Sequence, residues 1–340
     1  MIRLQSKPIA SLAEARKQLQ TAIGVEFGTL PPYLYALYSI PPGQNLQAAE
    51  RIKSVAMQEM IHMCLACNIL NAIGGEPALK PPKYPGPLPG DIGPPGGKPL
   101  KIRLYPFSKE AMAQGMAIEE PMDGPIDFPD KPMLKAGKSE TVTIGEFYTR
   151  LDAYLATLPA SDWHAGRNQI DDNQYFMGQL FDVNGYPDAH KAIEQIISEG
   201  EGASNSPLDF QQEVAHFYRF EEVFRNQVLT KDPNPKGYAW TGTLGVDWKA
   251  VYPAIIDPAS HDFSHDPPAA RAAQKACDAA FSRMVRELQL AVTGHEGHLG
   301  LAVRAMFDLR MAAHVAFTTP LADPKKVAGP SFVYKPGAWK

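Results

Sequence analysis

One apolar helix that carries two metal-binding residue types constrains this chain more than any other feature of its sequence. Between Ile52 and Gly75, apolar residues recur at the three- and four-residue spacing of an α-helix, and Gly74 follows the last of them as a helix-ending residue. The same stretch contains Glu59, with His62 three residues later. Residues three apart point the same way from a helix. A carboxylate that faces a core must be paired, protonated or bound to a cation, so the pattern indicates a buried ion-binding group.

A preceding helix carries a second inward-facing carboxylate. The capping box that begins at Ser11 predicts a helix that runs to about Tyr38, with Glu26 beside its apolar stripe. A short turn then makes the two helices antiparallel neighbours. Glu26 and Glu59 lie equally far from this turn along the chain, and at about 1.5 Å per residue their carboxylates should lie at the same level.

A third helix is predicted from about Asp188 in the second half of the chain. Its inner face includes Ile197 and continues one turn later to Glu201. Glu194 lies two turns before Glu201 on nearly the same face, whereas Glu199 is expected to point away. The spacing alone therefore leaves Glu201 and Glu194 as alternatives for an inward carboxylate.

A fourth helix is predicted from Ser206, a good N-cap residue, to about Leu229. Beside its aromatic inner face lie Glu213 and His216, which form a second Glu-x-x-His. One Glu from each of two helices and a Glu-x-x-His from each of the other two is the ligand arrangement of di-iron helix bundles. The sequence therefore predicts a two-metal site with six candidate ligands: Glu26, Glu59, His62, either Glu201 or Glu194, Glu213 and His216.

Composition limits the other possibilities. The 340 residues carry a net charge of -4 and are 44% hydrophobic and 21% charged, which are ordinary globular values and argue against a nucleic-acid or anionic-membrane surface. The chain start has no apolar signal segment, and no apolar run approaches membrane-spanning length. With only three cysteines, a disulfide framework is not expected, and we expect a cytoplasmic protein.

Proline defines the domain organisation. The 32 prolines gather in three segments that are expected to be wrapping loops: Pro77–Pro99, Pro121–Pro132 and Pro233–Pro268. We predict a helix bundle over residues 1–232, in which residues 77–185 form a Pro-rich crossover insertion. Residues 233–340 are expected to form a C-terminal appendage, with helices at about Pro268–Val292 and His295–Ala316 that pack on the bundle.

Two other clusters have simpler interpretations. Cys64 and Cys67 have the spacing of a redox or zinc pair, but they lie in mid-helix, where small core residues are the better interpretation. His295 and His298 flank a helix start, where a cap or surface cluster is expected. The sequence contains no glycine-rich phosphate loop, nucleophile elbow or Walker motif.

Several runs of this sequence resemble one family: the ferritin-like domain of iminophenylpyruvate dimer synthases, known from violacein and indolocarbazole biosynthesis, and its stand-alone relatives. The runs that carry the resemblance are Glu26–Ile40, Gln58–His62, Asn68–Gly75, Tyr84–Pro89, Glu199–Gly202, His216–Phe220 and Ala328–Pro330. The Glu-Gly-Glu-Gly match favours Glu201 over Glu194.

The resemblance implies an all-α protein, a ferritin-like four-helix bundle with long crossover loops and additional C-terminal helices. Two iron ions, or manganese or zinc in their place, would be bridged by Glu59 and Glu213, with Glu26 and Glu201 as terminal carboxylates. His62 and His216 would each donate one ring nitrogen.

The implied activity is an O2-dependent oxidation of a small organic molecule, derived from an amino acid, in secondary metabolism. A ferroxidase without an organic substrate and a non-catalytic ferritin-like scaffold subunit are the alternatives. Dioxygen and a small molecule are the expected partners, with a homodimer as the default assembly and no nucleic-acid or membrane partner.

Overall fold

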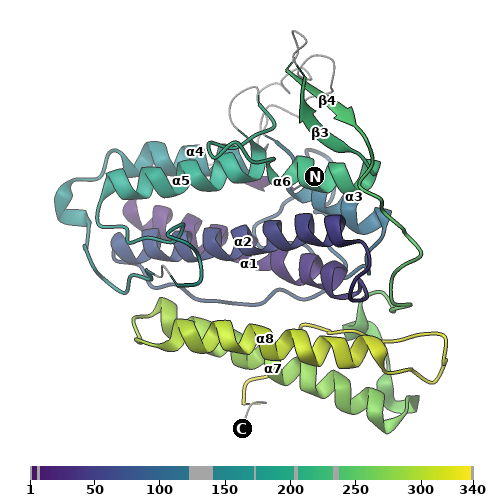
Figure 1. Ribbon diagram of the computed structural model, residues 1–340. Coiled ribbons are helices and arrows are strands. Elements are labelled where there is room, and N and C mark those ends of the chain that lie inside the picture. The colour runs from purple at the N-terminus through teal and green to yellow at the C-terminus, as the bar shows by residue number, and fades with distance from the viewer. Residues whose placement is uncertain are drawn as a thin grey trace.

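The protein is all-α, and its helices are stacked in layers (Figure 1). The computed structural model describes residues 2–5, 8–121, 141–171, 174–202, 206–232 and 237–337. The described helices are α1 (Leu12–Tyr38), α2 (Leu46–Ala72), α3 (Lys109–Ile118), α4 (Ile144–Leu155), α5 (Tyr186–Glu201), α6 (His216–Arg225), α7 (Pro268–Val292) and α8 (His298–Thr318). Three short 3-10 helices lie at Ala160–Asp162, Pro258–Ser260 and Phe263–His265.

Helices α1 and α2 form the hairpin that the sequence predicts, and they make the middle layer (Figure 1). The Ser11 hydroxyl accepts a hydrogen bond from the Glu14 backbone N–H at 3.2 Å, which confirms the predicted cap. The α1 helix continues through Pro31 and Pro32 without a break. Because both helices are mostly buried, their polar residues in mid-helix face protein rather than water.

The layer on one side of this hairpin consists of four short helices in two rows (Figure 1). Helices α3 and α4 follow one another against α1, and α5 and α6 follow one another against α2. Across the rows, α3 packs against α6 and α4 packs against α5. The bundle therefore has four walls, as expected, but two of them are interrupted near their middle.

This pairing corrects the expected wall assignment. Residues 77–185 were expected to be a crossover insertion, yet α3 and α4 come from this segment and form one bundle wall. Part of the expected loop Pro121–Pro132 lies outside the described residues. In the other wall, residues 202–215 separate the end of α5 at Glu201 from the start of α6 at His216, two helices that the sequence predicts as antiparallel neighbours joined by a short turn.

The helix expected from Ser206 to Leu229 is shorter at both ends. Asp209 accepts hydrogen bonds from the backbone N–H groups of Gln211 and Glu213, both at 2.8 Å, and this turn competes with helix formation. Helix α6 therefore begins only at His216.

Helix α6 ends at Arg225 and is capped by Asn226, which has the left-handed conformation; the chain then continues into a β-hairpin that the sequence does not predict. Its strands are β3 (Val228–Lys231) and β4 (Tyr238–Thr241), paired antiparallel. Another short antiparallel pair joins β1 (Leu4–Gln5) to β2 (Thr141–Val142).

Helices α7 and α8 cover the other side of the helical hairpin formed by α1 and α2 (Figure 1). Helix α7 has the predicted bounds, and α8 begins three residues later than predicted, at His298. Phe281 of α7 stacks on Phe27 with ring centroids 6.4 Å apart, within one continuous apolar core. The division into residues 1–232 and 233–340 stays a prediction. None of the described helices combines the length and apolar character that crossing a membrane requires.

Candidate metal centre

A cluster of buried acidic and histidine side chains lies where the short helices meet above α1 and α2. Glu26 comes from the middle of α1, and Glu59 and His62 from the middle of α2. Glu119 is the C-cap of α3, and His216 is the first residue of α6. All five side chains are less than a tenth exposed. The interruptions in two bundle walls therefore bring helix ends, with their polar residues, into the interior.

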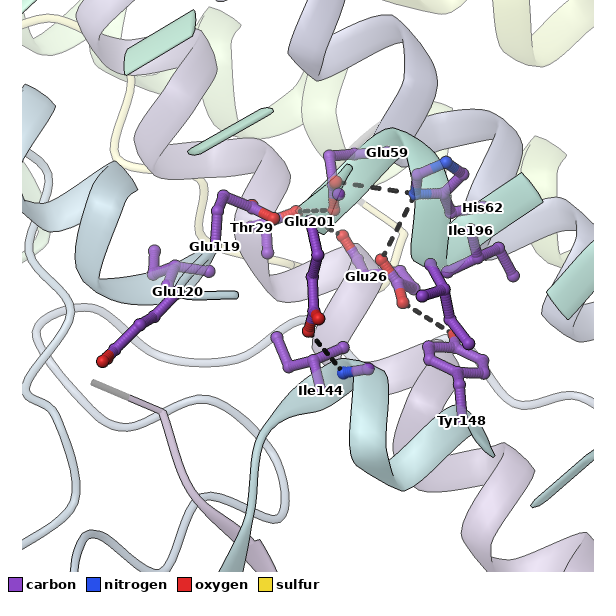
Figure 2. Close-up of a pocket in the computed structure, with 14 residues that line it drawn as sticks. Glu26, Thr29, Glu59, His62, Glu119, Glu120, Ile144, Tyr148, Ile196 and Glu201 are labelled. Atoms are coloured by element: carbon purple, nitrogen blue, oxygen red, sulfur yellow. Dashed lines mark hydrogen bonds and ion pairs between the residues drawn. The ribbon is translucent and has the colours of Figure 1, made fainter. Parts of the chain in front are cut away.

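Glu59 lies between the two histidines. Its Oε1 is 3.6 Å from Nδ1 of His62 and 2.9 Å from Nδ1 of His216. Glu26 Oε2 lies 4.0 Å from the same nitrogen of His62 (Figure 2), and Glu119 Oε2 lies 3.7 Å from that of His216. Each histidine thus presents Nδ1 to two carboxylates, and the two groups share Glu59.

Two buried tyrosines donate equivalent hydrogen bonds to the outer carboxylates, which are those of Glu26 and Glu119. The Tyr148 hydroxyl donates to Glu26 Oε1 at 2.6 Å (Figure 2), and the Tyr33 hydroxyl donates to Glu119 Oε1 at 2.5 Å. Each bond uses one carboxylate oxygen and leaves the other, Oε2, facing a histidine. The tyrosines therefore fix the orientation of both carboxylates.

Burial and mutual repulsion dominate the electrostatics. Burial, together with the nearby charge of Glu59, raises the pKa of Glu26 well above its usual value and also raises the pKa of Glu119. Burial would raise the pKa of Glu59 as well, but the imidazoles of His216 and His62 outweigh it and lower that pKa. Additional positive charge inside the cluster would stabilise the ionised form of all three carboxylates.

The donor set includes a group that could hold a metal ion. One oxygen of Glu59 and one ring nitrogen each of His62 and His216 lie within 4.8 Å of one another. Within the described part of the chain, Nδ1 of His216 has no hydrogen-bond partner although it is fully buried. Buried oxygen and nitrogen donors that converge in this way suit a cation, and carboxylate with imidazole suits iron, manganese or zinc.

The structure brings together four of the six predicted ligands: Glu26, Glu59, His62 and His216. Glu119 was missed. Its signal was present, because Met112, Gly115 and Glu119 lie at helical spacing on the buried side of α3 and its cap. Because α3 lies within the predicted crossover insertion, its inward carboxylate is not among the six predicted ligands.

Helix α5 differs from the expectation in one respect. Glu199 was expected to point away, and this is wrong: it is 1% exposed, and its Oε2 lies 2.7 Å from Nε2 of His62. Ala192 and Ile196 precede Glu199 by seven and three residues, so these positions define the true inner stripe. Glu194 has a half-exposed side chain near His190.

The two remaining predicted ligands lie outside the cluster. Glu201 lines the edge of the same cavity, where its Oε1 accepts a hydrogen bond from the Gly145 N–H at 2.9 Å (Figure 2). Glu213 precedes α6, and its side chain is 61% exposed and forms an ion pair with Arg219 at 3.0 Å. Because the helix starts at His216, Glu213 is not on the same helical face as that histidine.

A small cavity of about 20 Å³ adjoins the cluster. Ile118, Ile144 and Ile196 contribute apolar surface to it, whereas the Glu120 side chain extends away from the carboxylates (Figure 2). This volume is about that of one water-sized particle. On the opposite side of α1 and α2, against α8, lies a larger apolar cleft of about 660 Å³, which includes none of the cluster residues.

The cysteine and C-terminal histidine clusters have the simple roles expected of them. Cys64 and Cys67 are buried in α2, and burial raises the pKa of Cys64 to about 12, so it stays a thiol. His298 binds Glu287 at 2.5 Å next to the start of α8, away from the metal cluster.

Comparisons with known proteins agree with this fold. The family model described as Ferritin-like matches residues 19–225. The 2-imino-3-(indol-3-yl)propanoate dimerase of Chromobacterium violaceum is 27% identical over 267 residues, which cover 65% of this chain but only 24% of that protein. The crystal structure of a ferritin-like protein from Caulobacter vibrioides superposes with a TM-score of 0.65 at 24% identity, over 97% of this chain and 100% of that one. This last likeness concerns the fold alone.

Proposed function

The chain belongs to the ferritin-like family, and from this premise we propose that it is a di-iron carboxylate protein that reduces dioxygen. The observation that carries the proposal is the position of Glu59 between two histidine nitrogens. Glu26, Glu59 and His62 would hold one ion, and Glu59, Glu119 and His216 the other. When bound in the ferrous state, each iron would supply one electron to dioxygen.

The protein side chains would prepare this site in two ways. Tyr148 and Tyr33 hold the outer carboxylates with one oxygen free, so little reorganisation is needed when a cation binds. The isoleucines that line the cavity exclude water and strengthen the attraction between carboxylates and cations.

For the organic substrate, we propose a small molecule derived from an amino acid. The support is the similarity to the Chromobacterium violaceum protein, whose name specifies a 2-imino acid with an indole group. This chain spans about a quarter of that protein's length.

Iron oxidation without an organic substrate is the second candidate, and one observation favours it. The cavity of about 20 Å³ beside the cluster accommodates a diatomic gas far more readily than an aromatic ring. An organic substrate would require the surrounding helix ends to separate.

Anaerobic loading with ferrous iron followed by exposure to oxygen separates the candidates. Two irons per chain with near-ultraviolet oxo-bridge absorption support the di-iron site. Oxygen uptake that rises when an aromatic 2-imino acid is supplied, with consumption of that acid, supports the organic reaction. Uptake that depends on ferrous iron alone favours iron oxidation, and protein that takes up no metal favours the non-catalytic scaffold.

A further inference from the structure

The Nε2 atoms of the two cluster histidines, which face away from the shared carboxylate, contact different partners. Nε2 of His62 lies 2.7 Å from Oε2 of Glu199, whereas Nε2 of His216 lies 3.1 Å from Oε1 of Gln58. All four side chains are buried. In each case the outer contact fixes the ring so that Nδ1 faces the carboxylates, but one acceptor is an acid and the other a neutral amide.

Arg219 makes this difference larger. Its Nη1 donates to the same Gln58 oxygen at 2.8 Å and to the Ser54 hydroxyl at 2.8 Å, and its Nη2 binds Glu213 at 3.0 Å. The Arg219 side chain is 6% exposed, so its charge is poorly screened by water. The amide oxygen that accepts from His216 is thus already bound to a cation, which weakens it as an acceptor.

Ligand basicity follows from these partners. A carboxylate that accepts the outer N–H of a ligating histidine increases the electron density on the inner nitrogen, and an amide that is shared with an arginine does so much less. Nδ1 of His62 is therefore the stronger donor of the two.

The fixed charges also favour cation binding at the position beside His62. The position beside His62 has the carboxylates of Glu26, Glu59 and Glu199 around it. The position beside His216 has only Glu59 and Glu119 in front, and Arg219, which is paired with Glu213, lies behind Gln58. A divalent cation is attracted more strongly to the first position.

We propose that the two metal positions differ in affinity and fill in order, first the position of Glu26, Glu59 and His62, then that of Glu119 and His216. This inference rests on the proposed two-metal function. Glu199 and Gln58 act as positioning residues whose chemistry sets the order.

Titration of metal-free protein with Co²⁺, followed by calorimetry and by visible absorption, tests the order. The expected result is two steps, the first at least tenfold tighter than the second. Glu199→Gln gives His62 an amide partner and should weaken the first step 10- to 100-fold, the usual effect of losing such a contact. Gln58→Glu gives His216 a carboxylate partner and should tighten the second step.

Single-site variants identify the position that fills first. His216→Ala should keep the tight step and lose the weak one, and His62→Ala should lose the tight step. Glu194→Gln, which changes a half-exposed glutamate on the same helix as Glu199, is the matched control and should keep both steps. Two ions of equal affinity, or a Glu199→Gln variant that weakens only the second step, would overturn the order while leaving the two-metal function intact. Failure of the parent protein to bind Co²⁺ inside the cluster would overturn both.

Discussion

Oε1 of Glu59 lies 2.9 Å from Nδ1 of His216, although the two residues are separated by most of the bundle sequence. The contact does not have the geometry of a hydrogen bond, and among the described residues this buried nitrogen has no hydrogen-bond partner. The contact joins the middle of α2 to the first residue of α6, so it exists only because the wall formed by α5 and α6 is interrupted.

The shared carboxylate gives the first prediction. Glu59→Ala should abolish binding of both ions, because Glu59 faces both histidine nitrogens. Metal content per chain, measured after loading and desalting, checks this. Glu213→Gln should retain two ions, since its side chain is exposed and pairs with Arg219. An alanine variant at position 59 that still holds two ions would contradict the shared site.

The two acidic residues at the edges of the cluster give a second prediction. Glu119→Gln should lose the ion beside His216 and keep the other, because Glu119 faces only that histidine. Glu201→Gln should keep both ions if its role is the bond to Gly145. Loss of one ion in the Glu201 variant, with two retained in the Glu119 variant, would reverse this assignment.

Tyr148→Phe should destabilise the metal-free protein by about 1.5–3 kcal/mol, the range for losing a buried hydrogen bond to a charged group. The Tyr148 hydroxyl lowers the pKa of Glu26 by donating to it, against the raising effect of burial. Denaturant unfolding in a chelator-containing buffer at alkaline pH measures the loss. Tyr154→Phe, near the other end of α4 and only partly buried, is the control and should change stability little.

The metal-free protein should become less stable as the pH rises from about 5 to about 8. Burial and the neighbouring charge of Glu59 raise the pKa of Glu26 and of Glu119. Burial opposes protonation of His62, but Glu199 and Glu59 outweigh it and raise its pKa. Groups with a raised pKa in the folded state stabilise it fully below their unfolded pKa, and this contribution is lost as the pH rises through the folded value.

The lowered pKa of Glu59 acts at more acidic pH and does not reverse this trend. Metal ions displace the bound protons, so the stabilisation that they provide should increase over the same pH range. Melting temperatures with and without metal at several pH values check both slopes. A Glu26→Gln variant should show a shallower slope for the metal-free protein. A metal-free stability that increases with pH would contradict the prediction.

Two helical glycines provide a packing test. A Cβ at Gly115 would lie 2.8 Å from two atoms of the Phe220 ring, which is 1% exposed and cannot move away freely. Gly115→Ala should therefore destabilise the protein by about 1–3 kcal/mol. A Cβ at Gly300 would meet only the Tyr175 hydroxyl at 3.3 Å, so Gly300→Ala in α8 should be neutral or stabilising. Thermal unfolding of both variants makes the comparison.

Local signals in the sequence were sufficient for much of this protein. The Ser11 cap, the apolar stripes of α1 and α2 and the bounds of α7 follow from spacing and capping chemistry, because these helices are long and regular. Glu26 and Glu59 could be placed at the same level because one short turn connects their helices. The resemblance of several runs to one family indicated the ferritin-like fold, which the match to the family model confirms.

Tertiary structure decided which residues complete the site. The Asp209 turn delays the start of α6, which exposes Glu213 while leaving His216 at a buried helix end. Glu119 and Glu199 enter the cluster through the packing of α3 and α5 on the hairpin, and such long-range contacts have no period in the sequence. The sequence by itself determined the hairpin that carries Glu26, Glu59 and His62. The second half of the site depends on where two bundle walls are interrupted, and that is fixed by packing rather than by local propensity.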